Sequence, residues 1–112
     1  MKVAIIGSRN IDKKVAYKIL SLIPENTTEI ISGGADGVDK IAELIAENLS
    51  IKTTIFYPEY EKYGRAAPLR RNTQIISSAD YVLAFWDGQS QGTKRTIKEC
   101  LEIGKAIKVI KI

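Results

Sequence analysis

Five short apolar runs alternate with helical patterns along this chain, and this alternation limits the fold more than any other feature of the sequence. The runs lie at residues 2–6, 29–32, 53–56, 81–85 and 106–110. Runs of this kind are typical of strands buried on both faces of a parallel sheet. Apolar residues recur at helical spacing between them, at residues 12–23, from the turn near 37 to about 49, at 69–78 and at 92–103.

Strands that alternate with helices favour parallel pairing through right-handed crossovers. The sequence therefore predicts an α/β fold, a single Rossmann-like domain over residues 1–112 with three layers, α/β/α, and a five-stranded parallel sheet in the order 3-2-1-4-5. In that order the carboxyl ends of strands one, two and four surround the switch point where open α/β sheets bind ligands. Residues 57–68 are predicted to form a long connecting loop, a candidate lid or binding loop.

Composition narrows the function classes only partly. The chain has 17 basic and 13 acidic residues, interspersed rather than gathered, and a net charge of +4. This balance suits an anionic small ligand or weak nucleic-acid contact. No apolar run approaches the roughly 20 residues of a membrane span, and no signal-peptide pattern precedes the first strand, so we expect a cytoplasmic protein without membrane contact. With no histidine and with Cys100 alone, expected on a helix face, we expect no metal site.

A glycine-rich segment follows the second apolar run, where a strand turns into a helix. Residues 32–39 read Ser-Gly-Gly-Ala-Asp-Gly-Val-Asp. Glycine lets backbone N–H groups approach an anion closely, and a helix N-terminus adds unpaired donors. The segment predicts a phosphate-binding turn, although the same glycines also suit a tight turn without a ligand. A bulkier residue at Gly34 is expected to block the ligand and to leave the fold intact.

Two other strand ends carry glycine and polar residues, at 7–9 and 86–93. Their convergence with the glycine-rich segment predicts one ligand site, to which no catalytic residue or cofactor is assigned. The candidate ligand-binding residues are Gly7, Ser8, Arg9, Ser32, Gly33, Gly34, Ala35, Asp36, Gly37, Asp39, Arg71, Asn72, Asp87, Gly88, Gly92 and Thr93.

Single side chains within this set have expected roles. Arg9 and Arg71 are expected to pair with phosphate or carboxylate through a planar fork. Asp36 is expected to accept ribose hydroxyls, and Asp39 to tie the turn to the helix start. Thr93 is predicted either to contact a second phosphate or to cap the last helix, and the two roles are compatible.

Aromatic residues near the site have two interpretations. Tyr57, Tyr60 and Tyr63 in the long connection either stack a base or cover a core edge, and covering a core edge is the commoner outcome for such residues. Trp86 has the same two interpretations, with packing at the sheet edge favoured.

The turns also carry a resemblance to a known family. Gly7-Ser8-Arg9, residues 32–39, Arg70-Arg71-Asn72, Asp87-Gly88 and Gly92-Thr93 resemble the SLOG superfamily, in particular its DUF2493, YspA-related branch, over nearly the whole chain. The resemblance implies a nucleotide or nucleotide-derived ligand, by kinship with DNA-processing protein A and with the lonely-guy phosphoribohydrolases.

The chain departs from the phosphoribohydrolase pattern at the expected acid. Those enzymes carry a glutamate shortly after a Gly-Thr pair, whereas Lys94, Arg95 and Thr96 stand here, so only Asp87 or Glu99 is left as a substitute. The prediction is therefore a small nucleotide-derived ligand, bound as by a sensor, with a nucleotide-processing hydrolase as the alternative. Nucleic acid is expected to be an unlikely partner because the charge is scattered. The sequence leaves open whether the chain forms a homo-oligomer.

Overall fold

The computed structural model describes residues 1–9 and 11–112. Its centre is a parallel sheet of five strands in the order β3-β2-β1-β4-β5. The strands are β1 (Lys2–Gly7), β2 (Glu29–Ser32), β3 (Lys52–Ile55), β4 (Tyr81–Trp86) and β5 (Ile107–Lys111). The predicted Rossmann-like α/β fold and its strand order are confirmed.

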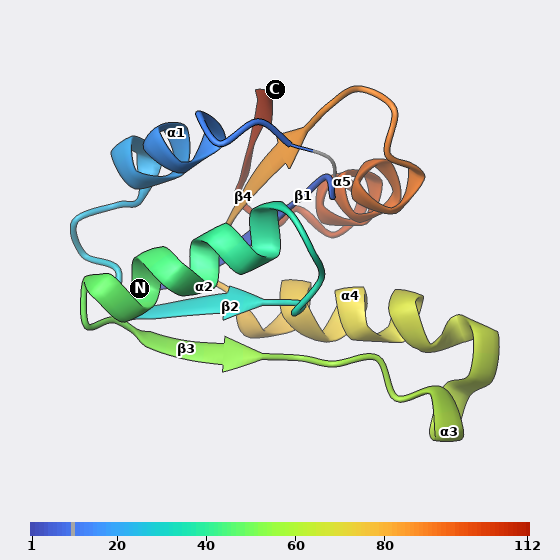
Figure 1. Cartoon of the computed structure of the whole chain (residues 1–112). Helices are drawn as coiled ribbons and strands as arrows, with labels where there is room; N and C mark the ends of the chain where they lie inside the picture. Colours follow the sequence, from blue (N-terminus) through green and yellow to red (C-terminus); the bar gives the residue numbers. More distant parts are fainter. Residues whose placement is uncertain (10) are drawn as a thin grey trace.

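Helices cover both faces of the sheet (Figure 1). One face carries α1 (Val15–Leu22) and α2 (Val38–Asn48), and the other carries α4 (Ala67–Ser78) and α5 (Gln91–Ile103). Successive residues of a strand point to opposite faces, so β1 sends Ile5 toward Ile19 of α1 and Ala4 toward the cluster of α4 and α5. The central strands β1, β2 and β4 are largely buried on both faces and are mostly apolar, whereas the edge strands β3 and β5 are partly exposed and include lysine or threonine.

The predicted loop at 57–68 contains regular structure. It holds α3 (Tyr60–Tyr63), the 3₁₀ helix η1 (Gly64–Ala66) and the first residues of α4. No residue of α3 or η1 is buried, and Figure 1 shows this segment projecting beyond the sheet. The sequence missed it because a short helix that buries no face has no apolar periodicity.

Two local features concern the start of α1 and the single cysteine. The carboxylate of Asp12 accepts the backbone N–H of Lys14, just before α1 begins. Cys100 lies on the buried face of α5, where burial raises the pKa of its thiol. A buried thiol of raised pKa is a structural residue rather than a reactive one.

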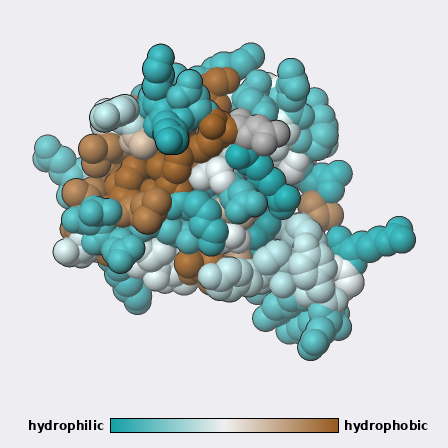
Figure 2. All heavy atoms as spheres, in the orientation of Figure 1, coloured by the Kyte–Doolittle hydropathy of each residue, from teal (hydrophilic) through white to brown (hydrophobic). Residues whose placement is uncertain are grey.

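Apolar surface gathers over α1 and α2 (Figure 2). Leu20, Leu44 and Leu49 are exposed there and border a shallow groove between the two helices. Among the residues that the structure describes, no helix is long and apolar enough to cross a membrane.

Candidate functional site

The carboxyl ends of β1, β2 and β4 border a cavity of about 490 Å³. It lies at the edge of the sheet that the sequence singles out. Its lining includes these candidate residues: Gly7, Arg9, Ala35, Asp39, Arg71, Asn72, Asp87, Gly92 and Thr93. The other candidates lie behind this lining or beside it: Ser8, Ser32, Gly33, Gly34, Asp36, Gly37 and Gly88.

The backbone N–H groups of the glycine-rich turn are largely engaged within the protein. The N–H of Gly34 donates to Ser32 Oγ over 3.3 Å, and that of Ala35 donates to Asp39 Oδ2 over 3.2 Å. At the start of α2, the N–H of Val38 donates to the carbonyl oxygen of Ser8. The expected role of Asp39 in tying the turn to the helix is therefore seen in the structure.

The glycines of this turn allow close packing of neighbouring segments. Gly34 has a φ of +69°, and a Cβ there would lie 2.8 Å from Cε1 of Tyr57. Gly37 has a φ of +81°, and its missing Cβ makes room for the backbone of Ser8 and Arg9. A valine at Gly34 would therefore strain the backbone and press on Tyr57, so this change is expected to lower the stability of the fold as well as to alter the turn.

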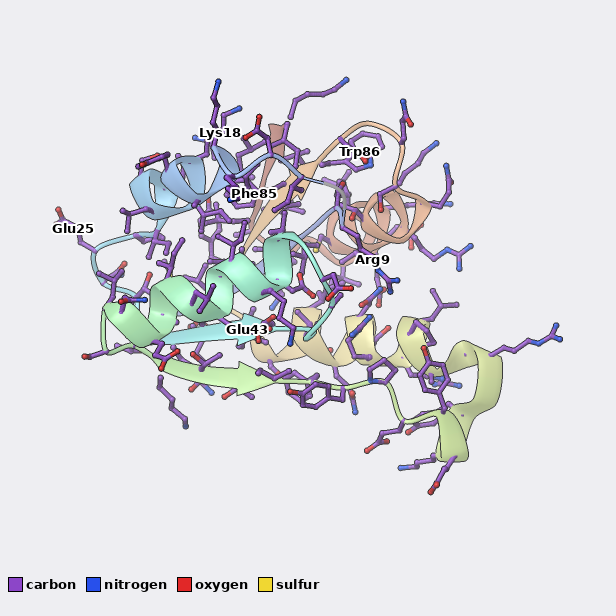
Figure 3. The ribbon with its side chains drawn as sticks, viewed as in Figure 1. Arg9, Lys18, Glu25, Glu43, Phe85 and Trp86 are labelled. Atoms are coloured by element: carbon purple, nitrogen blue, oxygen red, sulfur yellow. The ribbon has the colours of Figure 1, made fainter. Side chains whose placement is uncertain are left out.

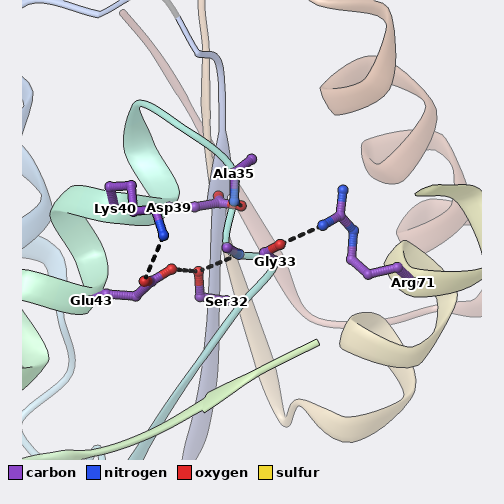
Figure 4. Close-up of polar contacts among 8 residues, drawn as sticks. Ser32, Gly33, Ala35, Asp39, Lys40, Glu43 and Arg71 are labelled. Atoms are coloured by element: carbon purple, nitrogen blue, oxygen red, sulfur yellow. Dashed lines mark hydrogen bonds and ion pairs between the residues drawn. The ribbon is translucent and has the colours of Figure 1, made fainter. Parts of the chain in front are cut away.

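Arg71 of α4 reaches across to the turn from the other side of the sheet (Figure 4). Its Nη1 donates to the carbonyl oxygen of Gly33, and its Nε donates to Asn72 Oδ1 over 2.8 Å. Arg71 is 8% exposed and Asp39 is 6% exposed. A Cβ on Gly33 would lie 2.9 Å from Arg71 Nη1 and 3.0 Å from Asp39 Oδ2, so both charged groups flank this glycine.

Burial perturbs both ionisable groups. Desolvation raises the pKa of Asp39 to about 6, although the N–H of Ala35 and the charge of Arg71 oppose the rise. Desolvation lowers the pKa of Arg71, with the charge of Arg9 adding to the decrease and Asp39 opposing it. Arg9 and Arg71 thus bring two like charges to the same cavity, an arrangement that an anion between them would relieve.

Arg9 reaches the cavity from the end of β1. In Figure 3 the side chain of Arg9 points into the space between the turn after β2, α4 and α5. The side chain of Lys18 extends from α1 into solvent, away from this space. The helices that border the cavity also carry the exposed cations Arg70, Lys94 and Arg95. Lys94 and Arg95 line a separate groove with Trp86, so Arg9 and Arg71 are the cations, among the described residues, that line the cavity itself.

The loop after β4 is held by Asp87. Its Oδ1 accepts the N–H groups of Gln89 and Ser90, each over 2.8 Å, and these bonds lower the pKa of Asp87. The N–H of Asp87 in turn donates to Ser8 Oγ over 3.1 Å, which ties this loop to the end of β1. A carboxyl group that accepts two backbone N–H groups and has a lowered pKa is poorly suited to donate a proton.

The other substitute acid, Glu99, lies elsewhere. Its Oε1 accepts the hydroxyl of Thr73 over 2.8 Å and so links α5 to α4 outside the cavity lining. The N-cap of α5 is Ser90, whose Oγ accepts the N–H of Thr93 over 3.5 Å. Thr93 is therefore not the cap, and its buried hydroxyl accepts from Ser90 Oγ over 3.1 Å.

The aromatic residues divide between the two interpretations. Tyr57 and Tyr60 are 60% and 61% exposed, so neither covers a core edge. Trp86 is half-buried and donates from Nε1 to the carbonyl oxygen of Ser90, which favours packing at the sheet edge.

Several lining residues were not among the candidates: Ile6, Pro68, Ile75, Gln89, Ser90 and Thr96. The apolar ones belong to a strand or helix pattern and carry no signal that separates them from core residues. Gln89 and Ser90 lie inside the segment 86–93 that was selected from the sequence, and serine is a residue type that N-cap positions prefer.

Comparison with known proteins identifies the family. The family model described as DNA recombination-mediator protein A matches residues 1–56, half of the chain. The chain belongs to the DNA recombination-mediator protein A family. The Gene 61 protein of Mycobacterium phage D29 is 31% identical over 81 residues, which cover 67% of this chain and 65% of that protein.

Two solved structures share the fold. DNA processing protein A of Streptococcus pneumoniae matches with a TM-score of 0.81 and 23% identity, over 96% of this chain and 49% of that one. DNA processing protein A of Helicobacter pylori, a protein with a single-stranded DNA binding mode, matches with a TM-score of 0.77 and 25% identity, over 97% and 64%. The chain thus spans about half to two-thirds of the length of these relatives.

Family membership confirms the predicted kinship with DNA-processing protein A and corrects the predicted function. The small nucleotide-derived ligand, the sensor and the hydrolase alternative are wrong, and so is the expectation that nucleic acid is an unlikely partner. The error came from judging charge along the sequence, whereas the fold brings Arg9 and Arg71, which are 62 positions apart in the chain, to one cavity.

Proposed function

We propose that this chain binds single-stranded DNA in the cavity at the carboxyl ends of β1, β2 and β4. The support is its family, together with the single-stranded DNA binding of the Helicobacter pylori relative. The observation that carries the proposal is the approach of Arg9 and Arg71 to one cavity. Paired guanidinium groups suit the phosphates of a DNA backbone, which dominate affinity in nucleic-acid binding.

The two arginines have different parts in this proposal. Arg71 is buried and fixed by Gly33 and Asn72, so it presents a cation at a defined position. Arg9 is exposed, so its side chain can adjust to the position of a phosphate. Gly92 adds an open backbone at the start of α5, since a Cβ there would meet no atom within 4 Å.

The remaining lining suits the rest of a nucleotide. Pro68, Ile6 and Ile75 give the cavity an apolar part, and Asn72 and Gln89 add polar groups. A volume of about 490 Å³ lies within the range of roughly 300–1,000 Å³ that small-molecule sites occupy. We propose that one nucleotide of the strand enters this cavity while the flanking phosphates stay near Arg9 and Arg71.

A binding measurement with matched variants tests the proposal. The probe is a fluorescein-labelled oligodeoxythymidylate, followed by fluorescence anisotropy, with unlabelled duplex of equal length as competitor. Arg9→Ala is expected to weaken binding at least about fivefold and to reduce the salt slope by about 0.7, because one phosphate contact is lost. Lys18→Ala removes a charge from the far side of α1 and is expected to bind as the wild type does.

Two results would count against this function. One is the absence of oligonucleotide binding at low salt, where phosphate contacts are strongest. The other is equal weakening by Arg9→Ala and Lys18→Ala, which would show a general effect of charge rather than a site. If unlabelled duplex displaces the labelled single strand as well as an unlabelled single strand does, the chain has no preference for single-stranded DNA.

A further inference from the structure

The segment between β3 and α4 carries exposed tyrosines beside the candidate site. Tyr57 follows the end of β3, and Tyr60 begins α3, which buries none of its residues. Single exposed aromatic residues are common and need no explanation. Two tyrosines within four residues, both more than half exposed, are less common, and Tyr57 lies against the glycine-rich turn that borders the cavity.

Both rings lie close to groups of the site. Cε1 of Tyr57 is the nearest atom to the position that a Cβ of Gly34 would occupy, at 2.8 Å, so this ring lies against the glycine-rich turn. Tyr60 lies near Arg71 and is among the groups that influence the pKa of that guanidinium. The two rings therefore border the turn and the arginine from the side of the projecting segment.

Cations accompany the tyrosines. Lys62 Nζ lies 5.1 Å from the centre of the Tyr63 ring, and the guanidinium carbon of Arg70 lies 5.4 Å from the same centre. Arg65 is exposed on η1. The carboxylates Glu59 and Glu61 stand on either side of Tyr60, so the cations of this segment gather around Tyr63. Aromatic rings near cations are the combination by which proteins hold single-stranded nucleic acid without reading its sequence.

We propose that Tyr57 and Tyr60 form a base-stacking platform that continues the DNA path from the cavity onto the segment between β3 and α4. This inference rests on the single-stranded DNA binding proposed above and assigns the bases, rather than the phosphates, to these two side chains. Bases stack on the exposed rings, while Lys62, Arg65 and Arg70 accompany the backbone. The platform contributes affinity for any base, because every base presents a flat face.

An abasic strand separates stacking from phosphate binding. The probes are a fluorescein-labelled oligodeoxythymidylate and a strand of the same length whose sugars carry no bases. Wild type is expected to bind the strand with bases at least about fivefold more tightly, the lower end of what one stacked base contributes. The double variant Tyr57→Leu/Tyr60→Leu is expected to lose this difference and to keep its affinity for the abasic strand.

Control variants keep the test decisive. Tyr57→Phe/Tyr60→Phe retains both rings and is expected to bind as the wild type does. Tyr17→Leu removes a ring that is 77% exposed on α1, away from the site, and is also expected to leave binding unchanged. Tyr60→Leu alone lies in a helix that buries nothing, so it is expected to reduce the preference for bases without loss of folding.

The outcomes distinguish the two proposals. Phosphate binding with a full preference for bases in the double leucine variant would overturn the platform and leave the DNA site standing. Equal affinity of wild type for both strands would do the same. Failure of wild type to bind either strand would overturn the DNA site, and the platform with it.

Discussion

Arg71 donates from its guanidinium to the carbonyl oxygen of Gly33, a residue 38 positions earlier in the chain. This hydrogen bond joins α4 to the turn that follows β2 and fixes a cation at the border of the cavity (Figure 4). Structural support and the proposed phosphate contact therefore depend on the same side chain, and variants of Arg71 affect both.

Loss of this contact should be visible as lost stability. Arg71→Ala is expected to lower the free energy of unfolding by about 1.5–3 kcal/mol, the range for a hydrogen bond to a charged group, because the carbonyl of Gly33 loses its donor. Urea denaturation measures this change. The neighbouring Arg70 is exposed, so Arg70→Ala is the matched control and is expected to stay within about 0.5 kcal/mol of wild type. An equal loss of stability in the two variants would contradict a stabilising role for the hydrogen bond between Arg71 and Gly33.

Asp39 should make stability depend on pH. Its pKa in the folded chain is about 6, above the ordinary value of 3.8, so the folded state holds a proton that the unfolded state has released. Stability from this group is therefore greatest below about pH 4 and is lost as the pH rises through about 6.

Asp39→Asn isolates this effect, since the amide oxygen still accepts the N–H of Ala35. Relative to wild type, the variant is expected to gain about 2–3 kcal/mol of stability between about pH 4 and pH 7. Urea denaturation across this pH range measures the difference. A difference between the two proteins that does not change with pH would show that Asp39 titrates normally.

The glycine-rich turn should tolerate a side chain poorly at Gly34. The residue has a positive φ, and a Cβ would press on Tyr57 and Ile55, so Gly34→Ala is expected to cost about 1–3 kcal/mol of unfolding free energy. At Gly92 a Cβ meets open space, so Gly92→Ala is expected to be neutral or slightly stabilising. Thermal denaturation of the two variants side by side makes the comparison. Equal melting temperatures would show that the turn relaxes around a Cβ.

The sheet and its strand order were predictable from the sequence because each strand is an apolar run and each crossover has helical spacing. The start of α4 was not predictable from the sequence because Pro68 lies in its first turn, and α3 was not predictable because it buries no residue. Apolar residues recur at regular spacing only where one face of a helix or strand is buried, so an exposed helical turn has no such pattern.

The place of the site was also predictable, because the unusual residues of 7–9, 32–39 and 86–93 stand at strand ends that a parallel sheet brings to one edge. The turn's own hydrogen bonds were not predictable. Sequence spacing does not reveal that Asp39 takes the N–H of Ala35, or that Arg71 reaches Gly33 from another element. The partner class was missed for a similar reason, since charge counted along the chain does not show which cations share a surface.

Photochemical crosslinking tests the location of the DNA most directly. A single strand that carries 5-iodo-2′-deoxyuridine is irradiated with the intact chain, and mass spectrometry identifies the attached residues. We expect crosslinks at the carboxyl edge of the sheet, at Tyr57, Tyr60 or Trp86. Crosslinks confined to Tyr17, the exposed tyrosine of α1 on the opposite side, would contradict DNA binding at the carboxyl ends of β1, β2 and β4.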